Sequence, residues 1–328
     1  MTEDGSFSLA ELEDAAERVY RVMPPTPQYA WPLLADALGC EVWVKHENHT
    51  PIGAFKVRGG LIFMDELERQ GALPEGFITA TRGNHGQSIP FAAQRYGVPV
   101  TVVVPEGNSR EKNRAMAAWG AELLVHGRDF DAARQEASRL AEERRLHFVP
   151  PFHPALVKGV ATYALELLRA VDRLDTVYVP IGMGSGICGL IRTRDLLGLD
   201  TEIVGVVSKH APAFALSVAE GRVVETSSAR TIADGVACRI PMAESLEVIR
   251  RGAARIVQVS DDEVAEAMRL MYRSTHNLAE GAGAAALAAL MQEAPSQRDK
   301  RVAVILTGGN VDAEVFAEVL AGRTPTPA

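Results

Sequence analysis

The chain of 328 residues is 47% hydrophobic and 23% charged, which is the composition of an ordinary soluble globular protein with room for two domains. Its net charge of −8 gives no sign of a nucleic-acid-binding surface, and no apolar run approaches the ~18 residues that a membrane span needs. Residues 1–20 lack the apolar core of a signal peptide, and Cys40, Cys188 and Cys238 show no metal or disulfide spacing. Reduced thiols and a cytoplasmic location are therefore expected.

Short apolar stretches rich in β-branched residues alternate with amphipathic stretches along most of the chain. This alternation predicts an α/β fold in which parallel sheets are covered by helices. Three prolines interrupt the pattern within residues 147–154, which predicts a crossover between two domains. In chain order, the expected elements are strand 41–45, helix 55–70, strand 77–79, a helix ending near residue 96, strand 100–104, helix 110–119, strand 122–125, helix 130–144, strand 176–181, helix 187–197, strand 202–207 and strand 302–306.

Lys56 is the first candidate catalytic residue. It follows Phe55 and a Pro/Gly turn at the start of an expected helix. Burial of an ammonium group costs free energy, so the pKa of this lysine should fall and its amine should become a nucleophile. Such amines form Schiff bases with carbonyl compounds, of which pyridoxal 5'-phosphate (PLP) is the commonest cofactor. A single lysine beside a turn is more often a surface residue, so the assignment depends on three further segments.

A glycine-rich loop joins the strand expected at 176–181 to the next helix. Free backbone N–H groups at such a helix start bind anions such as phosphate, although a tight turn without a ligand is the alternative. The glycines also fit a dinucleotide fingerprint, but the strand 202–207 ends in Ser208 and Lys209 rather than an acidic residue, which favours a monophosphate over NAD. The loop residues are Gly182, Met183, Gly184, Ser185 and Gly186.

Two other segments carry polar side chains next to strands. Residues 79–88 join a short strand to a helix start, where unpaired N–H groups can hold a carboxylate. Asn84 could simply cap that helix, but capping does not explain its polar neighbours. The strand 302–306 is followed by the hydroxyl of Thr307 and by two glycines. This segment is either a plain turn or a site at which the Thr307 hydroxyl contacts a ring nitrogen. The polar residues of the first segment include Thr81, Arg82, Asn84, His85 and Gln87.

In their order along the chain, these motifs resemble those of the fold-type II PLP-dependent enzymes, in particular the serine/threonine dehydratase and serine racemase family. The resemblance implies an α/β fold of the tryptophan synthase β-like type, with two parallel-sheet-containing domains and PLP in the cleft between them. It implies a small domain of residues 51–150 inserted in a large PLP-binding domain of residues 1–50 plus 151–328. The matching segments are Ala54–Gly60, Gly83–Gln87, Gly182–Gly186, Thr307–Asn310, Thr231–Val236 and Glu280–Gly283.

The resemblance also assigns roles to single residues. Lys56 would carry PLP as a Schiff base and then remove the Cα proton of the substrate. Asn84 would bond the phenolic oxygen of the cofactor and Thr307 its pyridine nitrogen. A neutral hydroxyl cannot protonate that nitrogen, which favours β-elimination over transamination. The expected cofactor contacts are Phe55, Lys56, Asn84, Gly182, Met183, Gly184, Ser185, Gly186, Thr307 and Gly308, and the expected substrate contacts are Thr81, Arg82, Gly83 and His85.

The expected activity is that of a PLP-dependent ammonia-lyase. L-Threonine, L-serine or another 3-hydroxy amino acid would lose water and then ammonia to give a 2-oxo acid. As substrates, 3-hydroxyaspartate, phenylserine and a hydroxyectoine-pathway intermediate stay open, and an amino-acid racemase is the alternative activity. An NAD(P)-dependent oxidoreductase and an inactive amino-acid sensor are disfavoured. The resemblance favours a homodimer, and no regulatory domain is expected after residue 323.

Several positions depart from the family pattern. Arg82 stands where the racemases have a serine base, and a guanidinium is a poor base, so racemisation is not expected. Arg82 could instead form a surface salt bridge, or bind a second carboxylate or an extended polar side chain of the substrate. Ser208 and Phe214 stand where relatives have metal-binding carboxylates, so no metal site is expected, although Lys209 could replace the charge of the ion.

Overall fold

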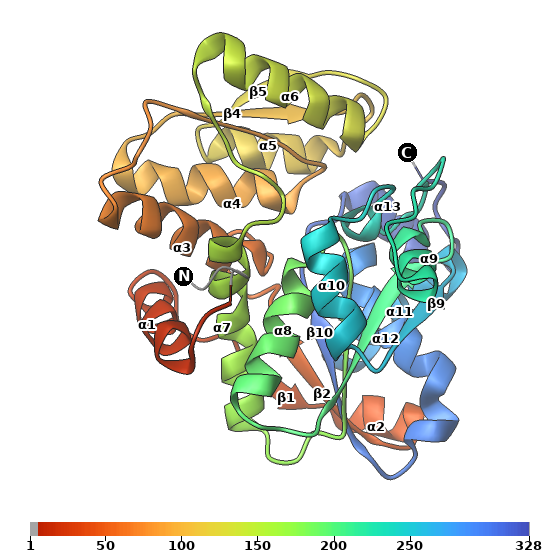
Figure 1. Ribbon diagram of the computed structural model, residues 1–328. Coiled ribbons are helices and arrows are strands. Elements are labelled where there is room, and N and C mark those ends of the chain that lie inside the picture. Colours follow the sequence, from red (N-terminus) through yellow and green to blue (C-terminus); the bar gives the residue numbers. More distant parts are fainter. Residues whose placement is uncertain (1–5, 328) are drawn as a thin grey trace.

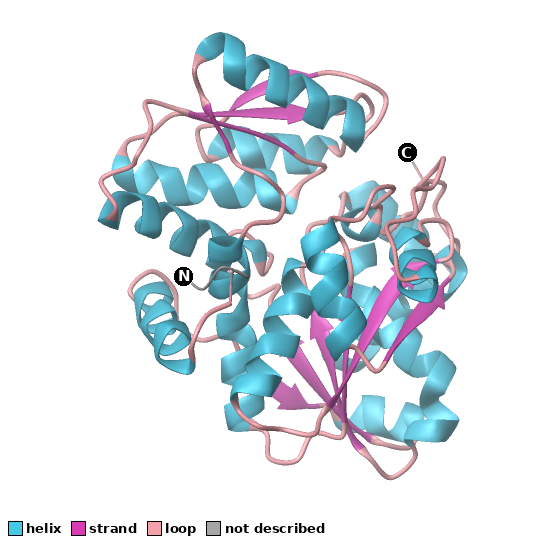
Figure 2. Ribbon diagram, in the orientation of Figure 1, coloured by secondary structure: helices cyan, strands magenta, loops and turns pink. Residues whose placement is uncertain are grey.

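The computed structural model describes residues 6–327 and contains two β-sheets, each covered by helices (Figures 1 and 2). The strands are β1 (Gln28–Ala30), β2 (Glu41–His46), β3 (Phe77–Ala80), β4 (Val100–Val104), β5 (Glu122–Val125), β6 (His147–Phe148), β7 (Thr176–Pro180), β8 (Glu202–Ser208), β9 (Arg255–Val259) and β10 (Arg301–Leu306). The α-helices are α1 (Leu9–Tyr20), α2 (Pro32–Leu38), α3 (Lys56–Arg69), α4 (Asn84–Ala93), α5 (Arg110–Ala118), α6 (Phe130–Arg144), α7 (Pro154–Ala170), α8 (Ser185–Leu196), α9 (Ala213–Glu220), α10 (Ala243–Gly252), α11 (Asp261–Thr275), α12 (Gly281–Glu293) and α13 (Ala313–Leu320).

The two sheets are almost entirely parallel. The smaller sheet has the strand order β5-β4-β3-β6, and the larger has the order β1-β2-β10-β7-β8-β9, in which only the edge pair β1–β2 is antiparallel. Every residue of β4 and β7 is buried, as expected for strands covered by helices on both faces. The predicted α/β fold with parallel sheets is confirmed.

The expected elements are present, with small differences at their ends. Helix α8 begins at Ser185 rather than at residue 187, because the last turn of the glycine loop is already helical. Helix α4 ends at Ala93 and is followed by a 3₁₀ turn (Gln94–Tyr96). The proline-rich stretch 147–154 contains the strand β6, which pairs with β3, and it ends in the first residue of α7. A two-residue strand is too short to show in a hydrophobic pattern.

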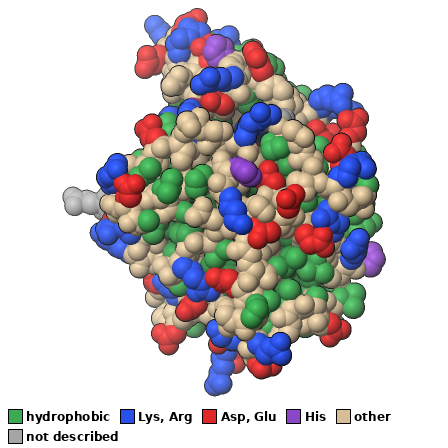
Figure 3. All heavy atoms as spheres, turned by 90° about the vertical axis from the view of Figure 1, so that its right-hand side faces the viewer, with side chains coloured by type: hydrophobic (Ala, Val, Ile, Leu, Met, Phe, Trp, Pro, Cys, Tyr) green, Lys and Arg blue, Asp and Glu red, His purple; other side chains and the backbone are tan. Residues whose placement is uncertain are grey.

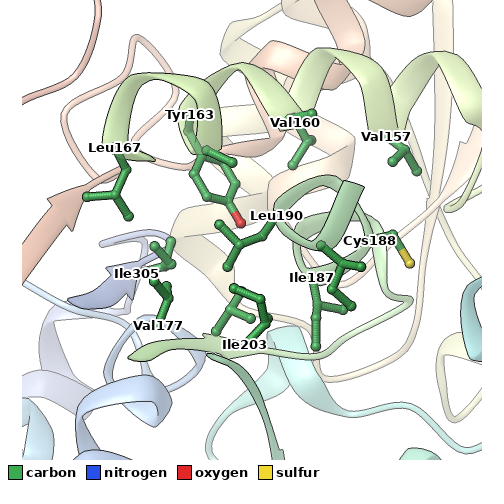
Figure 4. Packing of buried hydrophobic residues seen from close by; sticks show 14 of the residues in the cluster. Val157, Val160, Tyr163, Leu167, Val177, Ile187, Cys188, Leu190, Ile203 and Ile305 are labelled. Atoms are coloured by element: carbon green, nitrogen blue, oxygen red, sulfur yellow. The ribbon is translucent and has the colours of Figure 1, made fainter. Parts of the chain in front are cut away.

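Helices α7 and α8 share a hydrophobic cluster with strands of the larger sheet (Figure 4). Tyr163 of α7 lies over Leu190 of α8, and Ile203 and Ile305 contribute to the same cluster from β8 and β10. The Tyr163 hydroxyl is fully buried and donates a hydrogen bond of 2.9 Å to the carbonyl oxygen of Gly186. This bond ties the start of α8, and with it the glycine loop, to the hydrophobic core.

A buried ionic cluster joins α3 to β2 and α7. The guanidinium of Arg58 has no exposed surface and contacts Glu47 at 2.7 Å and Glu166 at 2.6 Å. Lys45 of β2 contacts the second oxygen of Glu166 at 2.5 Å, so two cations face two carboxylates. Burial would raise the pKa of Glu166, but the charges of Arg58 and Lys45 lower it. Arg58 lies two residues after Lys56, so this cluster fixes the start of α3.

The surface is mixed in charge. On the face shown in Figure 3, basic and acidic side chains are interspersed and neither sign forms a continuous stripe. Among residues 6–327, no helix is both long and apolar enough to cross a membrane. Cys40, Cys188 and Cys238 are all buried, and none of them pairs with another cysteine of residues 6–327.

Replacing Arg58 by methionine would leave Glu47 and Glu166 buried with only Lys45 as their counter-charge. Removing one member of a buried ion pair costs roughly 3–5 kcal/mol, whereas an exposed ion pair contributes little. We therefore expect Arg58→Met to lower the urea midpoint of unfolding strongly, and Arg139→Met, which breaks an exposed pair on α6, to leave it nearly unchanged. Circular dichroism during urea unfolding measures both. Equal midpoints for Arg58→Met and the unmodified protein would show that the cluster does not stabilise the fold.

Candidate active site

The predicted site residues come together in one cleft between the two sheets. Residues from the start of α3, the loop before α4, the glycine loop and the end of β10 face each other there. Gly308 is not among the lining residues, but it forms a β-bridge with Ala54 next to the cleft. The predicted residues that line the cleft are Phe55, Lys56, Thr81, Arg82, Gly83, Asn84, His85, Gly182, Met183, Gly184, Ser185, Gly186 and Thr307.

Backbone pairing places Lys56 at the end of β10. The segment before α3 runs antiparallel to the segment after β10: Phe55 N–H donates to the Thr307 carbonyl at 3.0 Å, and Gly309 N–H donates to the Gly53 carbonyl at 3.0 Å. The Ser88 hydroxyl of α4 donates to the carbonyl oxygen of Lys56 at 2.6 Å. The first residue of α3 is thus attached both to the larger sheet and to α4.

The side chain of Lys56 points across the cleft to the glycine loop. Its Nζ donates a hydrogen bond of 2.9 Å to Ser185 Oγ and lies 5.0 Å from the centroid of the Phe55 ring. Burial lowers the pKa of Lys56 to about 8, because the charged form loses its hydration. The direction agrees with the sequence-based expectation, and it makes the neutral amine available near physiological pH.

The glycine loop has no room for side chains at two positions. A Cβ atom at Gly182 would lie 2.3 Å from the carbonyl oxygen of Gly235, and one at Gly184 would lie 2.6 Å from the Cβ of Ser245. Gly184 also has a φ of +99°, which side-chain-bearing residues rarely adopt. Helix α8 follows directly at Ser185, so its first N–H groups, which have no intrahelical partner, open toward the cleft.

The loop between β3 and α4 and the first turn of α4 hold buried nitrogen atoms without a hydrogen-bond partner among residues 6–327. His85 is 7% exposed, its Nε2 has no hydrogen-bond partner, and burial lowers its pKa to about 3, so the imidazole is neutral. The Nε of Arg82 is also buried without a partner. Thr81 Oγ1 accepts a hydrogen bond of 2.9 Å from the Gly83 N–H and so shapes the turn.

Asn84 does not cap α4. The residue that precedes the helix is Gly83, without a side-chain cap. The amide of Asn84 instead donates to Glu280 Oε1 at 2.6 Å and accepts from Asn310 Nδ2 at 2.8 Å. The capping alternative is therefore wrong, and the orientation of this amide in the cleft is fixed from two sides.

A lysine that the sequence analysis misses closes one side of the cleft. Lys112 of α5 reaches across to Asp234 at 2.6 Å and to Glu280 at 3.0 Å. Burial opposes the charge of Lys112, but the two carboxylates raise its pKa, so the ammonium is retained. Burial and the neighbouring Asp234 raise the pKa of Glu280 despite Lys112. The two carboxylates lie in the matched segments 231–236 and 280–283, which is a usable signal, whereas Lys112 lies in a charged helix and gives none.

The residues at the positions where relatives have metal-binding carboxylates make other contacts in this chain. Phe214 is 1% exposed and packs in the core, and Ser208 Oγ accepts a hydrogen bond of 3.1 Å from the His210 N–H. Lys209 is half exposed and pairs with Glu263 at 3.0 Å. Within residues 6–327, no group of three or more His, Cys, Asp and Glu side chains is placed to hold a metal ion.

Comparison with known proteins identifies the class. Residues 19–308 match the family described as "Pyridoxal-phosphate dependent enzyme". The chain is 34% identical to the L-threonine ammonia-lyase of Geobacter sulfurreducens, over 94% of this chain and 77% of that protein. It is 30% identical to the L-threo-3-hydroxyaspartate ammonia-lyase of Saccharomyces cerevisiae, over 97% of each. The processed form of threonine deaminase isoform 2 from Solanum lycopersicum superposes with a TM-score of 0.87 at 30% identity, over 97% of this chain and 96% of that one.

The chain therefore belongs to the pyridoxal-phosphate-dependent enzymes. Within them, its relatives place it in the fold-type II serine/threonine dehydratase and serine racemase family, as predicted. Maize serine racemase, at 25% identity, also superposes with a TM-score of 0.88, over 96% of this chain and 97% of that one. The predicted cofactor, PLP, is confirmed.

The cleft residues fit this cofactor on physical grounds. A buried amine with a lowered pKa, that of Lys56, suits covalent attachment to an aldehyde. A turn without side chains at the start of α8 suits a phosphate. Asn84 and Thr307 place an amide and a hydroxyl, groups that can bond the polar atoms of a ring, in the lining of the same cleft.

Substitution at Gly184 tests the glycine loop. In Gly184→Ala the methyl group would meet Ser245, so the loop must shift, and strain of this kind costs roughly 1–3 kcal/mol. We expect PLP to bind about tenfold or more weakly. Gly198→Ala is the matched control, because Gly198 also has a positive φ, of +63°, but open space around it. Titration of the apoproteins of Gly184→Ala and Gly198→Ala with PLP measures the two dissociation constants. Equal constants would mean that the glycine loop is only a turn.

Proposed function

We propose that this enzyme eliminates water from a 3-hydroxy L-amino acid, such as L-threonine or L-serine, and releases a 2-oxo acid and ammonia. The observation that carries the proposal is the buried amine of Lys56, whose pKa is lowered to about 8, in the same cleft as the neutral hydroxyl of Thr307. The names of the relatives, L-threonine ammonia-lyase and L-threo-3-hydroxyaspartate ammonia-lyase, support it.

Each cleft residue has a task in this reaction. When bound, PLP draws off the electron pair that is released as the Cα–H bond of the substrate breaks. Lys56 would hold the cofactor through Nζ, and the same atom, when its amine is free, would accept the Cα proton of the substrate. Ser185 accepts a hydrogen bond from Nζ and keeps it oriented. The glycine loop binds the phosphate, and the first N–H groups of α4 bind the substrate carboxylate.

Thr307 favours elimination of the β-hydroxyl over other reactions of the same cofactor. A hydroxyl can donate or accept a hydrogen bond at the ring nitrogen but cannot transfer a full proton to it, so the electron pair from Cα is poorly stored in the ring. That pair would instead expel the β-hydroxyl, which leaves as water once it has taken up a proton, the one that Lys56 accepted from Cα being available for this step. The released enamine tautomerises to an imine, as Cβ gains a proton and the nitrogen loses one, and water hydrolyses the imine to the 2-oxo acid and ammonia.

Arg82 argues against the rival activity, racemisation. Inversion at Cα needs a second base on the face opposite Lys56, and a guanidinium keeps its proton at ordinary pH. Oxidoreduction with NAD is disfavoured because β8 is followed by Lys209 rather than by an acidic residue.

We also propose the domain division expected from the family. Strands β3 to β6 lie within residues 51–150, the small domain, and the other strands lie within residues 1–50 and 151–328, the large domain. A homodimer and a cytoplasmic location remain predictions from the sequence.

Assay of the purified holoenzyme against serine, threonine, 3-hydroxyaspartate and phenylserine tests the function. We expect formation of 2-oxo acid from at least one of them, without enrichment of the opposite enantiomer in the recovered substrate. Lys56→Ala should lower turnover by a factor of at least about 10³, since proton transfer by a positioned base and covalent attachment are both lost. Borohydride reduction followed by peptide mapping should place the pyridoxyl group on Lys56. Attachment to another lysine, or turnover by Lys56→Ala, would contradict the assignment.

Activity should not depend on a divalent cation. Ser208 and Phe214 offer a hydroxyl and a phenyl ring, whereas Mg²⁺ and Ca²⁺ are held by several charged or carbonyl oxygens. We expect the rate of 2-oxo acid formation at saturating PLP to be unchanged by EDTA and by added Mg²⁺ or Ca²⁺. A large loss with EDTA that Mg²⁺ restores would reveal other ligands, with Asp234 and Glu220 the first to test.

A further inference from the structure

Arg82 is a cation in the active-site cleft without a partner. It lies in the loop between β3 and α4 and lines both the cleft that contains Lys56 and an adjoining cavity. The other polar residues of that cavity include Asn108, Ser109, Arg110, Lys112, Thr231, Asp234, Glu280 and Asp312. The Nε of Arg82 is buried without a hydrogen-bond partner, and the structure shows no ion pair of Arg82 with any residue from 6 to 327. The surface salt bridge considered from the sequence is thus absent from the described part of the chain.

The other charged side chains grouped on this side of the cleft contact one another, with one ammonium between two carboxylates. Lys112 faces Asp234 and Glu280, so both carboxylates have a counter-charge other than Arg82. The pKa of Lys56 is lowered to about 8 by burial, so its charge is readily lost. A buried donor without an acceptor is unfavourable, and an anionic ligand at Arg82 would relieve this. The planar guanidinium, with its parallel N–H groups, matches a carboxylate in shape.

The carboxylate that every amino-acid substrate carries does not require Arg82. Helix α4 begins at Asn84, directly after this loop, and its first backbone N–H groups have no partners within the helix. They form an anion site of their own, with the dipole of α4 adding to the attraction. The guanidinium of Arg82 is therefore available to bind a second anionic group, and an amino-acid substrate can carry such a group only on its side chain.

We propose that Arg82 selects substrates with a carboxylate on the side chain, so that the preferred substrate class is the 3-hydroxy dicarboxylic amino acids. The inference rests on the proposed elimination and narrows it. In such a substrate the second carboxylate takes the place of the methyl group of threonine, and the leaving hydroxyl is unchanged. Arg82 then acts as a specificity-determining residue, and the Cα proton is still removed by Lys56.

The kinetic test compares two substrates of the holoenzyme, L-threo-3-hydroxyaspartate and L-threonine. A charge-assisted hydrogen-bonded pair corresponds to a preference of roughly 10- to 100-fold in kcat/KM for the dicarboxylic substrate. Arg82→Met, which keeps length but removes charge, should abolish the preference, mainly by raising KM for 3-hydroxyaspartate. Arg110→Met is the matched control, because Arg110 lines only the adjoining cavity, is 80% exposed and pairs with Glu314. It should keep the preference.

A binding test separates this inference from the proposed function. L-Aspartate and L-asparagine are isosteric, lack the leaving hydroxyl and differ in side-chain charge. By calorimetry on the holoenzyme, aspartate should bind about tenfold or more tightly than asparagine, and Arg82→Met should remove the difference. Equal affinities, or an equal weakening of both ligands by Arg82→Met, would overturn the inference while elimination from threonine still stands. Selective binding of aspartate without 2-oxo acid from any substrate would support Arg82 as the acid-binding residue and refute the elimination instead.

Discussion

A guanidinium with no exposed surface holds the catalytic end of α3 in place. Arg58 lies one half-turn into that helix, and its contacts with Glu47 and Glu166 attach the helix to the end of β2 and to α7. Burying a guanidinium is unfavourable unless its charge and donors are satisfied, so few other arrangements of these three segments are compatible with it. Lys56 is thereby directed into the cleft, where burial lowers its pKa.

The cofactor end of the cleft is set by packing rather than by charge. Tyr163 places its ring in the core and its hydroxyl on the carbonyl of Gly186, so the position of the glycine loop follows from the position of α7. The same helix carries Glu166, a partner of Arg58. One long buried helix therefore sets the spacing between the covalent anchor and the phosphate site, and the Lys56–Ser185 contact spans that spacing.

Local patterns were enough to predict much of this structure, and long-range side-chain pairing was not predictable. Short local patterns identify the strands β4 and β7 and the glycine loop, because an apolar run or a cluster of glycines extends over only a few consecutive residues. The contacts of Lys112 with Asp234 and Glu280 join residues more than a hundred positions apart, and no local pattern marks them. Arg58 likewise resembles a surface residue at a helix start, because its carboxylate partners on other segments are seen only after folding. Asn84 was open to a capping role for the same reason: its true partner, Glu280, is remote in the sequence.

The ion pairs of Lys112 join residues from separate segments that line the cleft. Any motion that parts α5 from the start of α12 and from the turn at residues 234–236 must pull the Lys112 ammonium away from two carboxylates and leave them without their counter-ion. Water entering the gap would offset that loss only in part. Separation of these segments is therefore opposed by electrostatics, and this opposition weakens with rising ionic strength as the separated charges become screened.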